Sequence, residues 1–240
     1  MNRLILIRHG QSLWNAENRF TGWVDTPLSE RGIQEAIKAG RLIKEFNIDI
    51  EEAFTSYLSR AVDTLNFLLK ELDKENLIIN KTWYLNERHY GSLTGLNKEE
   101  TKQKIGESLF LKYRRSWDIA PPRMEKNDKN ISLFGSLNKT IPGDKVPNTE
   151  SLKDTYDRVM KYYNETISDI FKKNNVVIIA AHGNSLRALC KYLFKISDIE
   201  INKLEIPTGN PMIINFSENL RVDNAKYLDK ERAKTIINID

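Results

Sequence analysis

The segment VVIIAAHGNSLRAL, residues 176–189, joins the strongest strand pattern of the chain to a helical pattern. Its first six residues are apolar and mostly β-branched, which is typical of a strand buried on both faces of a parallel sheet. The following apolar residues are at helical spacing: Leu186, Leu189, Cys190 and Leu193. The pattern predicts a strand that leads directly into a helix, with His182 at the point where the strand ends.

The same arrangement occurs near the N-terminus, in LILIRHGQS, residues 4–12. A short apolar run meets Arg8, His9 and Gly10, again at the expected end of a strand. Ligands of open α/β sheets bind at the carboxyl ends of the strands. A lone histidine is usually structural, and perturbed residues mark sites only probabilistically. Two His-Gly pairs on neighbouring strands would bring both imidazoles to one edge, where each glycine lets the backbone approach a ligand.

Strand and helix patterns alternate along the rest of the chain. Strands are predicted at 52–56, 77–80 and 212–216, the last of these being the final strand, and helices at 30–46, 59–72 and 152–170. Ser29 is a candidate N-cap, and Ser151 with Asp154 forms a candidate capping box. This alternation predicts a three-layer α/β/α fold with a mostly parallel central sheet.

Segment 118–149 interrupts this alternation. It holds four of the seven prolines, namely Pro121, Pro122, Pro142 and Pro147, and shows little periodicity. Long irregular segments in compact domains are usually lids or disordered. We therefore expect a single domain, 1–240, with a lid-like insertion at 118–149.

Composition excludes several classes of protein. The chain has 240 residues, 40% hydrophobic and 29% charged, with a net charge of +4, as in a soluble globular protein. The mild charge favours an anionic ligand over nucleic acid, and no run approaches the roughly 18 apolar residues of a membrane span. We expect no signal peptide. The single cysteine, Cys190, favours a reducing compartment, so we expect a cytoplasmic protein. From the charge and the hydropathy we expect neither nucleic-acid nor membrane partners.

The residue types at the two strand ends favour phosphoryl chemistry. The chain has three histidines but neither an HExxH motif nor paired cysteines, so a metal site is not expected. One imidazole can attack phosphorus while the other stabilises the developing charge. Arg8 offers a planar fork for phosphate oxygens, and Arg60 lies at a predicted helix start, a natural anion site. A serine hydrolase with Ser185 as nucleophile is the rival, but Gly183-x-Ser185-x-Arg187 departs from GxSxG.

Over nearly its whole length the chain resembles the cofactor-dependent phosphoglycerate mutases of the histidine phosphatase superfamily. The RHG motif is general to the superfamily. Two features are much more specific to the mutases, namely NERHYG followed by GLNK, and the paired arginines before Pro-Pro. The matching stretches are RHGQSLWNAENRFTGW (8–23), TPLSERG (26–32), SRAVDTL (59–65), LNERHYGSLTGLNKEET (85–101), YRRSWDIAPP (113–122), TESL (149–152), AAHGNSLRAL (180–189) and IPTGNP (206–211).

The resemblance implies a role for each matching residue. His9 would be the nucleophile that becomes phosphohistidine, and Glu87 the general acid/base for the substrate hydroxyl. The phosphoryl group would be held by His182, Arg8 and Arg60. The substrate-binding residues would be Asn15, Thr21, Gly22, Arg88, Tyr90, Lys98, Arg114, Arg115, Gly183 and Asn184. From the residues alone, Arg114 and Arg115 could equally form a solvated helix face. His89 should point away from Glu87 if this segment is extended, and we expect it to be non-catalytic.

The resemblance also implies an activity. It is the interconversion of 3-phosphoglycerate and 2-phosphoglycerate through a phosphohistidine enzyme and a 2,3-bisphosphoglycerate intermediate, which also serves as the phosphoryl primer. The partners would be small phosphorylated three-carbon acids, no metal would be needed, and the chain would form a homodimer or homotetramer. Water must be kept out, because it would hydrolyse the phosphoenzyme.

Three alternatives remain in view. A phosphatase shares the two-histidine centre but has no need of the carboxylate-binding cluster, and a non-catalytic anion-binding module would be expected to lose His9 or Glu87. A bisphosphoglycerate synthase is less favoured, because Thr21 and Gly22 match the mutase version of their loop. The chain departs from the family pattern at 128–138 and in its short tail after KYLDKE. Both departures bear on the balance between mutase and phosphatase activity.

Overall fold

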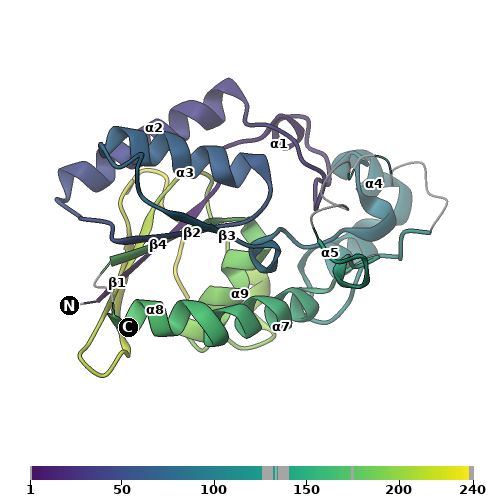
Figure 1. Cartoon of the computed structure of the whole chain (residues 1–240). Helices are drawn as coiled ribbons and strands as arrows, with labels where there is room; N and C mark the ends of the chain where they lie inside the picture. Colours follow the sequence, from purple (N-terminus) through teal and green to yellow (C-terminus); the bar gives the residue numbers. More distant parts are fainter. Residues whose placement is uncertain (1, 126–131, 133, 135–140, 174–175, 238–240) are drawn as a thin grey trace.

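A six-stranded sheet crosses the molecule, with helices on both of its faces (Figure 1). The computed structural model describes residues 2–125, 132, 134, 141–173 and 176–237. The strands are β1 (Arg3–Arg8), β2 (Glu52–Thr55), β3 (Ile79–Lys81), β4 (Val176–Ala181), β5 (Met212–Phe216) and β6 (Val222–Tyr227). Their order in the sheet is β3-β2-β4-β1-β5-β6. The three-layer α/β/α architecture is therefore confirmed.

The sheet is parallel from β3 to β1 and antiparallel beyond it. β1 pairs in parallel with β4 and β4 with β2, whereas β5 runs antiparallel to both β1 and β6. The prediction that 212–216 is the final strand is wrong, because β6 follows it. In β6, VDNAKY, the polar residues Asp223, Asn224 and Lys226 interrupt the few residues that reach the core, namely Val222, Ala225 and Tyr227, so the segment lacks a clear apolar pattern. At the other edge β3 begins two residues later than predicted.

The helices surround the sheet and extend beyond it. The described α-helices are α1 (Leu13–Ala16), α2 (Glu30–Glu45), α3 (Ser59–Glu71), α4 (Lys98–Ile105), α5 (Glu107–Arg115), α7 (Leu152–Tyr162), α8 (Ser168–Lys173) and α9 (Gly183–Leu193). Short 3₁₀-helices are η1 (Trp83–Leu85), η2 (Gly91–Leu93), η4 (Gly143–Lys145) and η6 (Glu200–Lys203). Figure 1 shows α2 and α3 over one face, and α7, α8 and α9 over the other. Within the described residues, no helix is both long and apolar enough to cross a membrane.

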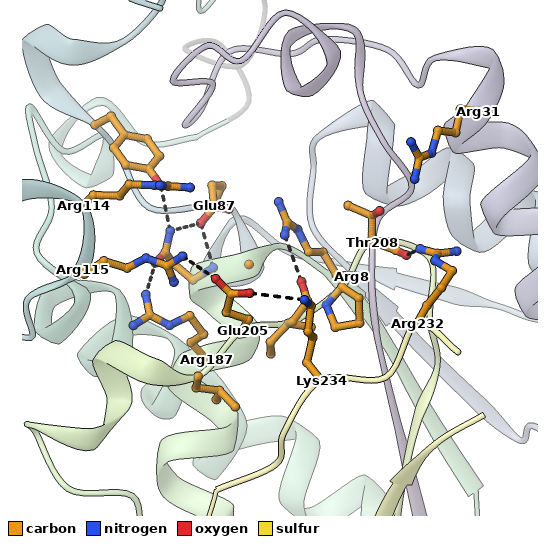
Figure 2. Close-up of a pocket in the computed structure, with 16 residues that line it drawn as sticks. Arg8, Arg31, Glu87, Arg114, Arg115, Arg187, Glu205, Thr208, Arg232 and Lys234 are labelled. Carbon is orange, nitrogen blue, oxygen red and sulfur yellow. Dashed lines mark hydrogen bonds and ion pairs between the residues drawn. The ribbon is translucent and has the colours of Figure 1, made fainter. Parts of the chain in front are cut away.

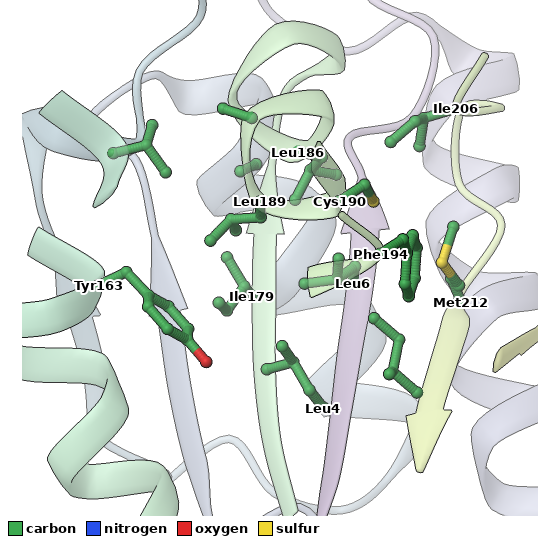
Figure 3. Packing of buried hydrophobic residues seen from close by; sticks show 14 of the residues in the cluster. Leu4, Leu6, Tyr163, Ile179, Leu186, Leu189, Cys190, Phe194, Ile206 and Met212 are labelled. Carbon is green, nitrogen blue, oxygen red and sulfur yellow. The ribbon is translucent and has the colours of Figure 1, made fainter. Parts of the chain in front are cut away.

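Alternate residues of the central strands face the two helical layers, as the pleat requires. Leu4, Leu6 and Ile179 pack with α7 and α9, and Figure 3 shows them beneath Leu186 and Leu189. The residues between them pack with α2 and α3: Ile5, Ile7, Ile178 and Ala180. Because both faces are buried, these strands are continuously apolar, which is the pattern seen in the sequence.

The predicted helix boundaries are largely confirmed by their caps. The Ser29 side chain accepts a hydrogen bond from the Gly32 backbone N–H, and Ser151 and Asp154 form a reciprocal capping box. The helix predicted over 152–170 is not uniform, because a π-helical turn, η5 (Tyr163–Ile167), separates α7 from α8. Such single turns occur as bulges inside α-helices.

The helices α4 and α5 lie beyond the carboxyl ends of β1 and β4 (Figure 1). The described part of segment 118–149 packs in this region. Met124, Phe134 and Ile141 form a small apolar cluster with Trp23 and Val24. Most of the departure at 128–138 lies outside the described residues.

Candidate active site

The two His-Gly strand ends lie side by side. β1 and β4 are paired in register, and the His9 backbone N–H donates to the Ala181 carbonyl at 2.9 Å. The rings of His9 and His182 have centroids 4.9 Å apart at an interplanar angle of 60°. Both side chains are buried. The expectation that neighbouring strands bring the two imidazoles together is therefore confirmed.

His9 is arranged as a nucleophile. Its Nδ1 lies 2.7 Å from the Gly10 carbonyl oxygen, which can only accept a hydrogen bond, so Nδ1 carries the proton and Nε2 the lone pair. Burial lowers the pKa of His9 well below 6.5, and the charges of Arg60 and Arg8 lower it further. The ring is neutral at physiological pH, and Nε2 is available to attack phosphorus.

Gly10 is required where the chain leaves β1. A Cβ at this position would lie 2.2 Å from the carbonyl oxygen of Gly32 in α2, a distance that no side chain could occupy. The Gly10 N–H donates to the Thr64 hydroxyl of α3 at 3.0 Å. The loop after His9 is thus held between α2 and α3, which restricts the position of the imidazole.

His182 is held by a residue that sequence reasoning missed. Its Nε2 lies 2.8 Å from the hydroxyl of Ser56, which directly follows β2 and itself accepts from the Leu58 N–H. The Ser56 hydroxyl fixes the ring through Nε2, and Nδ1 has no hydrogen-bond partner among the described residues. Burial lowers the pKa of His182 well below 6.5. His182 is therefore neutral beside His9.

Two arginines complete the centre around the histidines. Arg60 is fully buried, and its Nε donates toward His9 Nε2 at 3.3 Å. Its remaining nitrogens bond the carbonyls of Val24 and Gly22 at 2.9 and 2.8 Å. Burial lowers the pKa of Arg60 to about 10, so it stays charged at neutral pH. Arg8 donates to the Ile206 carbonyl, while its buried Nε has no partner in the described part of the chain.

Glu87 presents its two carboxylate oxygens to different surroundings. Oε1 accepts from the Arg88 N–H at 2.8 Å, the Asn184 N–H at 3.1 Å and the Asn184 side-chain amide at 2.9 Å. Oε2 lies near the N-terminus of α9, 3.6 Å from the position that a Cβ on Gly183 would take. Three donors therefore fix the carboxylate through Oε1 and leave Oε2 for proton transfer.

The backbone of Glu87 is fixed from behind. Its carbonyl accepts from Trp23 Nε1 at 2.5 Å and Arg158 Nη2 at 2.9 Å. Arg158 is paired in turn with buried Glu150, which also accepts from the His89 N–H. The acid/base candidate is thus held by α7 and by the loop that contains Trp23.

Two adjoining cavities contain most of the predicted site residues. A cavity of about 80 Å³ and one of about 500 Å³ share Arg8, Glu87, Tyr90 and Arg114 in their walls. The smaller cavity also contains His9, Asn15, Thr21, Gly22, Arg60 and Lys98. The larger cavity, shown in Figure 2, also contains Arg115, Gly183 and Asn184. Arg114 and Arg115 therefore lie half-buried in the walls of this cavity.

Arg88 does not line either cavity, although it follows Glu87 in the sequence. Its Nη2 donates to the carbonyls of Tyr113 and Arg114, both at 3.0 Å, and its guanidinium lies over the Tyr90 ring. It thereby holds the C-terminal end of α5 and supports Tyr90 from behind.

His89 lies away from the cavities, as expected. It is buried against Trp23 and Phe134, and its Nδ1 accepts from the Gly91 N–H at 3.0 Å. Burial lowers its pKa to about 4. The structure therefore places His89 in a packing position, with its ring nitrogen held by the local backbone.

The larger cavity is strongly cationic. Its walls include seven basic side chains, Arg8, Arg31, Arg114, Arg115, Arg187, Arg232 and Lys234, against two carboxylates, Glu87 and Glu205. In the smaller cavity, burial and the nearby charges of Arg114 and Arg8 lower the pKa of Lys98 to about 8. Clustered cations repel one another, and binding of a multiply charged anion relieves this repulsion. Among the described residues, no group of three or more His, Cys, Asp or Glu side chains could hold a metal ion.

Sequence reasoning did not assign Arg31, Arg187, Arg232 or Lys234 to the site. Arg187 had a usable signal, because it lies three residues after Asn184 on a predicted helix and therefore shares its face. The tail residues Arg232 and Lys234 had none, because only tertiary packing returns the tail to the sheet edge.

Comparisons with known proteins agree with this geometry. The sequence matches the family model of the histidine phosphatase superfamily (branch 1) over residues 4–222. It is 51% identical over 238 residues to a 2,3-bisphosphoglycerate-dependent phosphoglycerate mutase of Pelagibacter ubique, with 99% of each chain covered. A protein of the same name from Parabacteroides distasonis is 46% identical, with 99% of this chain and 96% of the relative covered.

Among solved structures, a mycobacterial glucosyl-3-phosphoglycerate phosphatase superposes with a TM-score of 0.72. Its sequence identity is 22%, and the alignment covers 95% of this chain and 98% of the other. At this level of identity the likeness concerns the fold alone.

Proposed function

The chain belongs to the histidine phosphatase superfamily, and we propose that it interconverts 3-phosphoglycerate and 2-phosphoglycerate by the residue roles given below. The observation that carries these roles is that His9 and Glu87 line one small cavity whose other charged side chains are all cations. A nucleophile for phosphorus and an acid/base for a hydroxyl then face the same bound substrate.

His9 accepts and returns the phosphoryl group. As Nε2 attacks phosphorus, the P–N bond forms while the P–O bond to the donor oxygen breaks. The charge on the transferring oxygens is stabilised by Arg60, by the free Nε of Arg8 and by the neighbouring His182 ring. These groups are fixed by their other hydrogen bonds, so little reorganisation is needed during transfer.

Glu87 moves the proton. When the substrate hydroxyl attacks phosphohistidine, Oε2 takes its proton, and in the reverse transfer Oε2 returns a proton to the departing oxygen. The donors on Oε1 keep Oε2 directed toward the cavity. The N-terminus of α9 adds backbone N–H groups that favour the carboxylate.

The residues present fit a bisphosphorylated three-carbon acid. Buried polar atoms without partners among the described residues include Arg8 Nε, His182 Nδ1 and Thr21 Oγ1, all suited to anionic oxygens. Lys98, Tyr90, Arg114 and Arg115 would hold the carboxylate and the second phosphate. When bound, 2,3-bisphosphoglycerate supplies the phosphoryl group that primes His9.

The described part of segment 118–149 belongs to the same catalytic domain, 1–240. Met124 and Phe134 pack against Trp23, whose indole N–H bonds the Glu87 carbonyl. This packing supports a role of the segment in shielding the phosphoenzyme from water. A homodimer or homotetramer in the cytoplasm remains a prediction from the family, to be tested by sedimentation equilibrium and cell fractionation.

A coupled assay of 2-phosphoglycerate formation tests the function. We expect turnover of 3-phosphoglycerate to require catalytic 2,3-bisphosphoglycerate and to be unchanged by a chelator, because cationic side chains neutralise the transferring phosphate. Release of inorganic phosphate without 2-phosphoglycerate would instead show a phosphatase. Loss of turnover in the chelator, with recovery on adding Mn²⁺, would overturn the metal-independent mechanism.

A further inference from the structure

Arg187 lies behind the acid/base group, and the roles above give it only a share of the positive charge of the cavity. It belongs to α9, is 4% exposed, and lies beside Arg115 at the end of the cavity that contains Glu87 (Figure 2). Its Nη1 donates to Asn184 Oδ1 at 3.0 Å, and its Nη2 donates to the Ile201 carbonyl of η6 at 2.5 Å. The guanidinium is therefore fixed at both ends, with one end directed to Asn184.

This contact holds the oxygen side of the Asn184 amide. A guanidinium has donors and no acceptor, so the atom facing Arg187 must be the amide oxygen. The amide nitrogen then faces Glu87 Oε1 at 2.9 Å and the Tyr90 hydroxyl at 3.1 Å. Without Arg187 the amide would lose the donor that holds its oxygen, and its nitrogen would be less firmly fixed on Glu87 Oε1.

The charge of Arg187 is unfavourable for a purely structural residue. Within the described part of the chain it forms no salt bridge. Burial, Arg115 and Arg88 lower its pKa to about 9. A neutral donor could bond the same carbonyl without this electrostatic cost. A buried, unpaired cation that bonds Asn184 is better explained by the chemistry of the site.

We propose that Arg187 is a positioning residue for Glu87. By bonding the oxygen of the Asn184 amide, it keeps the amide nitrogen hydrogen-bonded to Glu87 Oε1. Oε2 then stays free and directed at the substrate hydroxyl. This inference rests on the proposed role of Glu87. A direct contact of Arg187 with substrate is the alternative that the experiment must separate.

The test is R187M, with R41M as the matched control. Arg41 is an exposed arginine of α2 that pairs with Glu71, far from the cavities. We expect R187M to lower mutase kcat by roughly 10- to 100-fold, with little change in KM. This loss is smaller than the loss expected when the acid/base group itself is removed. Phosphorylation of His9 by p-nitrophenyl phosphate should be unchanged, because the nitrophenolate leaves as an anion without needing a proton. R41M should match wild type in all three measurements.

The same substitution in an E87Q background shows whether Arg187 acts through Glu87. If it does, adding R187M to E87Q lowers kcat no further, because the positioned carboxylate is already gone. Equal fold losses in both backgrounds, a rise in KM as the main effect, or wild-type kcat in R187M would each overturn the proposal. Failure of the wild-type chain to form 2-phosphoglycerate would overturn the proposed function instead.

Should R187M fold poorly, R187K is the second variant. Lysine keeps the charge but cannot bond Asn184 and the Ile201 carbonyl with one planar group. We expect a smaller loss of kcat, which also disappears in the E87Q background. An R187K protein with the turnover of R41M would overturn the positioning role.

Discussion

Replacing Glu87 by glutamine removes the proposed proton acceptor while leaving its place in the structure occupied. The three donors on Oε1, at 2.8, 2.9 and 3.1 Å, can all bond the amide oxygen of glutamine. They therefore orient the side chain so that its NH₂ group takes the position of Oε2. The variant keeps the shape of the site and loses the group that takes the hydroxyl proton.

The size of the effect follows from this substitution. General acid–base catalysis contributes roughly 10²–10⁴ in rate, or about 2.7–5.4 kcal/mol of activation free energy. We expect kcat for 2-phosphoglycerate formation to fall by that factor in E87Q, with His9 still able to accept a phosphoryl group from p-nitrophenyl phosphate. E87A should in addition lower the Tm, because it leaves three buried donors without an acceptor, at about 1–3 kcal/mol each.

A coupled assay of 2-phosphoglycerate and thermal denaturation of both variants provide the measurements. Turnover of E87Q close to that of wild type would refute the acid/base role of Glu87. Equal Tm values for E87Q and E87A would refute the argument that three donors depend on Oε1.

Other predictions concern the nucleophile, its loop and the buried imidazoles. H9A should abolish phosphoenzyme formation, so that labelled 2,3-bisphosphoglycerate gives an acid-labile, alkali-stable label on wild type only; a stable label on H9A would contradict the assignment. G10A should lower the Tm by several degrees and slow His9 phosphorylation, because the new Cβ would lie 2.2 Å from the Gly32 carbonyl oxygen. Such overpacking costs about 1–3 kcal/mol of folding free energy. A G10A protein with the wild-type Tm would show that the contact relaxes freely. The free energy of unfolding should fall as the pH drops below about 6.5, because His9, His89 and His182 have lowered pKa values when folded and take up protons on unfolding. Urea titrations from neutral pH to about pH 5 would test this, and a flat profile would mean that the histidines are already charged in the native state.

The main elements of the fold were predictable because their patterns are local. Both faces of β1 and β4 are buried, so their sequences are continuously apolar, and the faces of α2 and α3 repeat at helical spacing. The edge strand β6 was missed because its core-facing residues, Val222, Ala225 and Tyr227, do not form a regular alternation, and its ladder with β5 is irregular. The π-helical turn after α7 has no periodic signal either, because one extra residue does not change the apolar spacing on either side.

Part of the candidate site could be proposed from local sequence alone. His9 and Glu87 follow motifs whose positions at strand and loop ends are visible in the sequence. The direction of Arg88 was not visible, because its guanidinium is captured by carbonyls at the end of α5. Ser56 was overlooked because a serine after a strand is common, and its contact with His182 comes from a different strand.

By itself the sequence determined the alternation of strands and helices, and which chemical groups stand at the strand ends. Strand and helix periods depend on residues a few positions apart, so one sequence is enough to predict them. The tertiary structure alone decided which of two neighbouring groups is left free of protein donors, Oε2 rather than Oε1 of Glu87, and which arginine lines the cavity, Arg187 rather than Arg88. Those directions are set by hydrogen bonds between residues far apart in the chain, as between Asn184 and Glu87, and such contacts exist only once the sheet and its helices have packed.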